Sequence, residues 1–150
     1  MAPSNTSTSQ PDTVIQSLGS TWSQQDLGEA FDVETMSVLS ELDPSGVNGI
    51  ISEVLILFQA SLDPVLERLE HCRATGAAAD IRFEAHRLKS AAAQLGALRL
   101  AAACAEIMKS LSAEAVAPTR SRDTDVGLLV DKLVAEIVRV QRQLRRLLQP

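Results

Sequence analysis

Aromatic residues are scarce in this 150-residue chain, which has no tyrosine, one tryptophan and three phenylalanines. Because 45% of the residues are nevertheless hydrophobic, the core must be built from Leu, Val, Ile and Ala, a composition that suits helix packing more than a sandwich or a barrel. The length is that of one domain with a core of its own.

Long apolar runs, a secretory start and an excess of basic residues are also missing. No apolar stretch approaches the roughly 18 residues needed to cross a bilayer, and the polar start Met1–Thr6 lacks the features of a signal peptide. The net charge of −5, with no dense basic face, argues against a nucleic-acid partner. We therefore expect a cytoplasmic protein that binds neither membranes nor nucleic acid.

Cysteine is represented only by Cys72 and Cys104, which lie far apart within helical patterns. This spacing fits neither a metal-binding knuckle nor a redox pair, and a reduced cytosolic compartment is the simpler interpretation.

Apolar residues recur with helical spacing through most of the chain. Residues 1–30 are polar and predict a flexible or loosely packed tail. Beyond them we expect a short helix capped by Asp32, a long kinked helix from Val47 past Pro64 to Gly76, and three further helices, over 77–95, around 100–111 and after a connection at 113–122. The sequence therefore predicts an all-α fold over residues 31–149, an antiparallel up-and-down four-helix bundle with an additional short N-terminal helix.

The most informative stretch runs from Glu84 to Ala97. On a helix with about 100° per residue, one narrow apolar stripe forms that must face the core; it comprises Ile81, Ala85, Leu88, Ala92 and Leu95. His86 falls roughly 140° from the middle of this stripe, so its imidazole should stand in solvent.

Small residues line the helix face that carries His86. Ser90, Ala93 and Ala97 follow it at successive turns, and Ala79 precedes it by two turns. They leave a flat surface on which another protein can bring a reactive group up to the ring. Lys89 and Arg82 flank this surface and can reach a dianion held on the imidazole. The pattern predicts a histidine that is approached and modified.

The run His86-Arg87-Leu88-Lys89-Ser90-Ala91-Ala92-Ala93-Gln94-Leu95-Gly96-Ala97 resembles the signature of histidine-containing phosphotransfer (HPt) domains, in which His-x-Leu-Lys-Gly is followed by small residues and Leu-Gly. The likeness extends from about Phe31 to Leu148. It implies that His86 accepts a phosphoryl group from a receiver-domain aspartate and passes it to the aspartate of another response regulator, while Lys89 balances the charge.

The resemblance also implies a carrier and not an enzyme. The partner receiver domain, of a response regulator or a hybrid sensor kinase, supplies the acidic pocket and Mg²⁺, and this chain binds no cofactor and no metal. We expect a monomer whose docking surface combines the small residues near His86 with flanking side chains, namely Arg82, Phe83, Arg87, Ala93 and Ala97.

Two positions depart from the family pattern. Ser90 stands where glycine is usual; it is small enough to keep the surface open, so we expect transfer to be retained with an altered rate. Met108 stands where some relatives place a polar residue that orients the histidine. If Met108 faces His86, the ring must be oriented by another group.

Other classes of helical bundle fit less well. A di-metal carboxylate protein needs inward Glu-x-x-His pairs, but Phe83 precedes His86 by three residues and Arg68 precedes His71. Haem ligation needs an inward ligand. A helical adaptor that binds a receiver domain or a kinase without being phosphorylated is the remaining alternative, and phosphorylation of His86 distinguishes the two.

Overall fold

The computed structural model describes residues 23–114 and 122–149, and in those ranges all regular structure is helical. The two shortest helices come first in this part of the chain and four long ones follow. In order they are α2 (Gln24–Leu27), α3 (Val33–Ser40), α4 (Ile50–Thr75), α5 (Ala78–Gln94), α6 (Leu98–Glu114) and α7 (Arg122–Leu148).

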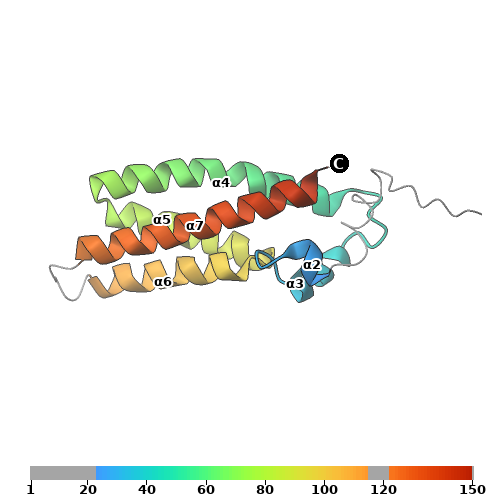
Figure 1. Ribbon diagram of the computed structural model, residues 1–150, viewed down its shortest axis with the longest axis horizontal. Helices are drawn as coiled ribbons and strands as arrows, with labels where there is room; N and C mark the ends of the chain where they lie inside the picture. The colour runs from blue at the N-terminus through green and yellow to red at the C-terminus, as the bar shows by residue number, and fades with distance from the viewer. Residues whose placement is uncertain (1–22, 115–121, 150) are drawn as a thin grey trace, which may run out of the picture.

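The four long helices run side by side in alternating directions, while α2 and α3 lie at the end of the bundle near the C-terminus (Figure 1). Helix α5 packs against α4 and α6, and α7 packs against the same two helices. The helices therefore form a closed ring in which α5 and α7 lie diagonally opposite. The predicted antiparallel four-helix bundle with an additional short N-terminal helix is confirmed.

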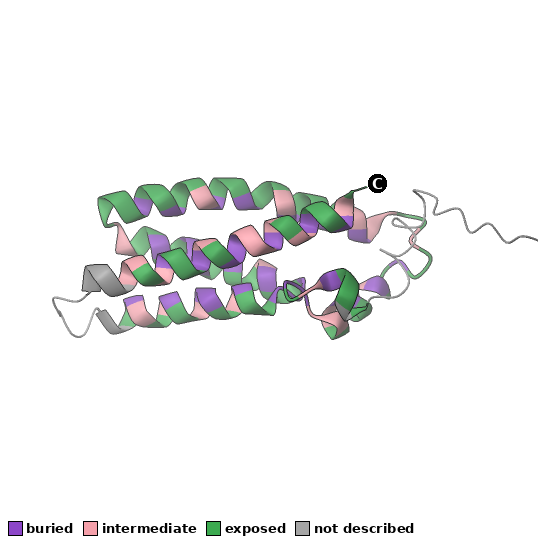
Figure 2. Ribbon diagram, viewed as in Figure 1, coloured by how far each residue is buried: buried purple, intermediate pink, exposed green. Residues whose placement is uncertain are grey.

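The core is built mainly from aliphatic side chains on one stripe of each long helix, and Phe31 and Phe58 are also buried in it. Figure 2 shows these buried positions recurring along the long helices. On α7 the stripe repeats at helical spacing through Val130, Leu133, Ile137, Val140 and Leu144, all essentially inaccessible to solvent. This periodic burial supplies most of the stability of such helices, because helix propensity alone is weak.

Helix α4 continues through Pro64 as a single helix of 26 residues, as predicted. It begins at Ile50, three residues later than the apolar pattern suggested. Gly49 precedes it in the left-handed conformation, and the buried Asp43 carboxylate accepts a hydrogen bond from the Ile50 amide at 3.3 Å. The side chain of Asp43 therefore satisfies one of the free amides at the start of the helix.

Helix α3 begins after Asp32, whose carboxylate accepts hydrogen bonds from the Thr35 amide at 2.9 Å and from the Thr35 hydroxyl at 2.8 Å. These bonds favour the charged form and lower the pKa of Asp32, the amide contributing more than the hydroxyl. The predicted capping role of Asp32 is confirmed.

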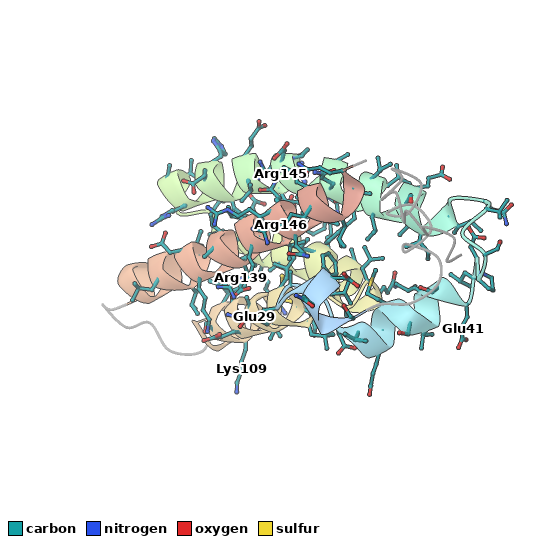
Figure 3. The ribbon with its side chains drawn as sticks, turned by 45° about the vertical axis from the view of Figure 1, so that its right-hand side comes forward. Glu29, Glu41, Lys109, Arg139, Arg145 and Arg146 are labelled. Atoms are coloured by element: carbon teal, nitrogen blue, oxygen red, sulfur yellow. The ribbon has the colours of Figure 1, made fainter. Side chains whose placement is uncertain are left out.

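The expectation of a loose tail up to residue 30 is wrong for its last part. Leu27 and Ala30 are buried in the core, and the Glu29 carboxylate pairs with Arg99 at 2.7 Å and with Arg139 at 3.1 Å. Figure 3 shows Glu29 lying close to Arg139 of α7. The segment is packed because it brings apolar residues to the core and an anion to the start of α6 and the C-terminal half of α7. Residues 1–22 lie outside the described part of the chain.

The predicted connection at 113–122 is shorter in the structure, because α6 extends to Glu114 and α7 begins at Arg122. Residues 115–121 lie outside the described part of the chain.

Candidate functional site

His86 lies in the middle of α5 and its side chain is exposed, as predicted. The other side of the same helix supplies the expected apolar stripe. Ala85 and Ala92 are fully buried, and Leu88 is nearly so. The position of the imidazole is thus fixed by the packing of the neighbouring residues, which leaves only the side-chain torsions of His86 free.

An open cavity of about 370 Å³ lies beside the imidazole, between α5 and α6. Its walls are Ala79, Arg82, Phe83 and His86 from α5, and Met108 from α6. Met108 therefore faces the same space as His86. A thioether is at best a weak hydrogen-bond acceptor, so Met108 does not take over the orienting role of the polar residue found in some relatives.

No protein group in the described ranges hydrogen-bonds the His86 ring. The place of His86 on α5 therefore sets the direction of the ring, which itself lines the cavity. A partner that approaches the exposed face meets a nitrogen that is not already engaged with a side chain of residues 23–114 or 122–149.

Three cations surround His86 on the exposed face of α5: Arg82, Arg87 and Lys89. In the described part of the chain none of the three forms an ion pair, whereas Arg68, Arg73, Arg99, Lys132 and Arg139 do. The Arg87 guanidinium lies 5.6 Å from the centre of the Phe83 ring, a cation–π distance. These charges make the surface around His86 basic in a protein whose net charge is negative.

The positive charge of Lys89 acts on the buried Cys104 thiol of α6, where it opposes the rise in pKa that burial causes. Helix α6 also carries an exposed cation, Lys109, which projects away from the bundle (Figure 3). Lys109, like the three cations on α5, has no carboxylate partner among the described side chains.

The small residues near His86 are only partly arranged as predicted. Ser90 and Ala93 are exposed on the same face of α5 as His86. Ala97, expected on the docking surface, is fully buried, so that prediction is wrong. The helix ends at Gln94 and Gly96 turns the backbone at φ 80°. The 3.6-residue period that placed Ala97 on the exposed face therefore stops before reaching it.

A second groove, of about 340 Å³, lies between α4 and α5 and includes a residue that sequence reasoning missed. Glu84 is only 5% exposed, and its Oε1 accepts a hydrogen bond from Arg68 Nε at 2.6 Å. Its Oε2 is buried and has no hydrogen-bond partner. This ion pair fixes α4 against the helix that carries His86. The sequence signal was weak, because Glu84 adjoins the apolar stripe but Arg68 lies sixteen residues away.

Clusters of three or more His, Cys, Asp or Glu side chains suited to a metal ion do not occur in residues 23–114 and 122–149. Over the same ranges no helix is both long and apolar enough to span a membrane. Both cysteines are buried and unpaired.

Comparison with known families gives one result. The Hpt domain family model matches residues 53–149, which include nearly all of α4 and the whole of α5, α6 and α7. Comparison with curated proteins and with solved structures gives no significant match. The family match covers well over half of the chain, and its range contains His86 and the bundle that exposes it. The chain therefore belongs to the Hpt domain family, whose members act in phosphotransfer in two-component signalling.

Proposed function

We propose that this protein is a phosphorelay intermediate that carries a phosphoryl group on His86. The group would arrive from the aspartyl phosphate of one receiver domain and leave to the aspartate of another response regulator. The observation that carries this proposal is the exposed imidazole on a helix of the Hpt domain match, with no protein hydrogen bond holding it among the described residues.

In the transfer step one bond to phosphorus forms and one breaks, and the imidazole is the only group of this chain that reacts. A neutral ring nitrogen of His86 attacks the phosphorus, the bond from phosphorus to the aspartyl oxygen breaks, and the aspartate leaves as a carboxylate. The imidazolium formed then loses a proton to solvent. Imidazole suits this role because it is neutral and nucleophilic near pH 7. The partner receiver domain would supply Mg²⁺ and the acidic pocket, and this chain would bind no cofactor itself.

Lys89 and Arg82 would stabilise the charge of the phosphorylated ring. A phosphoryl group adds close to two negative charges at neutral pH, and cations within one turn of it lower its free energy. Lys89 lies three residues after His86 and Arg82 lies four residues before it, so both are on adjacent turns of α5. Ser90 would keep the surface open, as glycine does in most relatives.

The docking surface would centre on Arg82, Phe83, Arg87 and Ala93, all of them exposed around His86. Ala97 is excluded from this surface because it is fully buried. The same surface lies diagonally across the bundle from α7, so a receiver on α5 leaves α7 uncovered. We propose that the protein acts as a monomeric carrier that presents this one face to successive partners.

An unphosphorylated adaptor is the second candidate, because an exposed surface with apolar and basic residues also suits binding alone. A pulse-chase experiment distinguishes the two functions. The protein is first labelled by a phosphorylated receiver domain with Mg²⁺, purified, and then mixed with a second receiver domain. A carrier gains an acid-labile, base-stable label and loses it to the second receiver; an adaptor binds the receivers and gains no label.

A further inference from the structure

We propose that the cavity between α5 and α6 is a socket for one bulky apolar side chain of the partner receiver domain, and that Phe83 and Met108 thereby select the partner. The inference rests on the proposed function, because the partner is taken to be a receiver domain that approaches His86. It adds a specificity site to that function.

The walls of the cavity are suited to an apolar side chain. Phe83 is 58% exposed although its ring is large and apolar, and Met108 of α6 faces it across the cavity with the small Ala79 nearby. A single exposed phenylalanine needs no explanation. Here it lies with a methionine in a hollow beside the reactive imidazole, and aromatic side chains in such central pockets are often binding hot spots.

Met108 sets the polarity of the cavity wall that α6 provides. Its thioether is flexible and polarizable and offers an adaptable apolar surface. Met108 therefore gives the cavity an apolar wall that a partner can contact. An apolar side chain inserted between Phe83 and Met108 would exclude water from both and would set the distance between the partner and His86.

The rim of the cavity indicates the charge of the partner surface. Arg82 lines the cavity, and Arg87 lies over the Phe83 ring. Neither is paired with a carboxylate in the described ranges. At physiological salt the field of these cations extends about 8 Å, so it acts on groups at the contact despite the net charge of −5. The partner that fits presents one large apolar residue next to acidic side chains.

Two variants and one control test the socket. Phe83→Ala removes the wall on α5, and Met108→Ala removes the wall on α6 without adding a polar group that could hydrogen-bond the imidazole. Leu128→Ala is the matched control, because Leu128 is 62% exposed but lies on α7, diagonally across the bundle from α5. The probe is the receiver domain that labels the wild-type protein fastest among the receivers of the same cell, and its Kd is measured by calorimetry without phosphorylation.

We expect Phe83→Ala and Met108→Ala to raise the Kd about tenfold or more, as for truncation of a hot-spot residue, and Leu128→Ala to change it less than twofold. In transfer assays the two socket variants should raise the KM for the receiver while kcat stays within a few fold, the pattern expected for loss of binding without loss of chemistry. Circular dichroism checks that the variants are folded.

The outcomes separate the two proposals. If the wild type is labelled on His86 but both socket variants bind the receiver as tightly as it does, the socket is refuted and the relay stands. If both variants reduce kcat without changing KM, the residues act on the chemistry and the socket is again refuted. If no receiver binds or labels the folded wild-type protein, the relay and the socket fall together.

Discussion

The amide of Asp32 donates a hydrogen bond of 2.7 Å to the carbonyl oxygen of Gly96. This contact joins the N-terminal cap of α3 to the turn between α5 and α6, which closes the His86 signature. A Cβ on Gly96 would lie 2.9 Å from the Cβ of Thr35, and the backbone there has φ 80°. The glycine at the end of the signature thus lets α3 pack on the bundle.

Gly96→Ala should be strongly destabilising, because it combines backbone strain with a steric clash. The left-handed conformation alone costs a non-glycine residue about 1 to 3 kcal/mol. Gly76 has a similar φ of 71° but open space around it, so Gly76→Ala should cost less. Gly127 lies inside α7 with nothing near it, and Gly127→Ala should stabilise by about 0.5 to 1 kcal/mol. Urea unfolding midpoints measure all three. An equal drop in the unfolding midpoint for Gly96→Ala and Gly76→Ala would contradict the role of Gly96 in packing α3 on the bundle.

The Arg68–Glu84 pair should matter more to stability than the exposed ion pairs. Arg68→Ala leaves the buried Glu84 carboxylate without its partner, which should cost about 1 to 3 kcal/mol in the free energy of unfolding. Arg73→Ala is the control, since it breaks a pair with Asp131 in which both side chains are exposed and should cost at most about 1 kcal/mol. If the two variants unfold at the same urea concentration, water solvates the Glu84 carboxylate once Arg68 is removed, and the predicted larger loss of stability is wrong.

Lys89→Ala should slow transfer to His86 and leave the fold intact. Removal of one charge-stabilising donor from an enclosed site lowers rates a hundredfold or more. Because Lys89 is exposed, the expected loss is about tenfold. Lys109→Ala is a suitable control, because Lys109 points away from the bundle on α6 (Figure 3). Single-turnover labelling by a phosphorylated receiver gives both rates; a wild-type rate for Lys89→Ala would refute the role of the lysine.

Cys104 should be inert to thiol reagents in the folded protein. Burial raises its pKa from 9.0 to about 12, against a smaller opposing effect of Lys89, and only the thiolate reacts. The raised pKa also predicts a pH effect. The contribution of Cys104 to stability is complete below pH 9 and is lost between pH 9 and about 12, as the thiol ionises in the unfolded chain only. Fast modification of Cys104 at pH 8 without denaturant would contradict this burial.

The face of α5 that carries His86 was predictable because its periodicity is local. Five apolar residues at steps of four and three fix which side of the helix is buried, and the exposed position of His86 follows from geometry. The run through Pro64 was predictable for the same reason. The same periodicity predicts the wrong face for Ala97, because α5 ends at Gln94 and the helical period does not continue to residue 97.

Contacts between distant residues were not predictable in this way. Arg68 and Glu84 meet across two helices, and Glu29 meets Arg139 from 110 positions away. Neither pair forms a pattern along the chain, so the buried carboxylate and the packing of residues 23–30 were both missed. A segment with only Leu27 and Ala30 as inward positions is too short to show a period.

The most direct test of the relay compares the two histidines of this chain. Wild type, His86→Gln and His71→Gln are incubated with phosphorylated receiver domains and Mg²⁺, and the acid-labile, base-stable label on each protein is measured. His71 is a matched control because it is the other histidine and is also exposed, on α4. If His86 carries the phosphoryl group, wild type and His71→Gln are fully labelled and His86→Gln is not labelled. Labelling that survives in His86→Gln, or no labelling of folded wild type by any active receiver of the same cell, would contradict the relay.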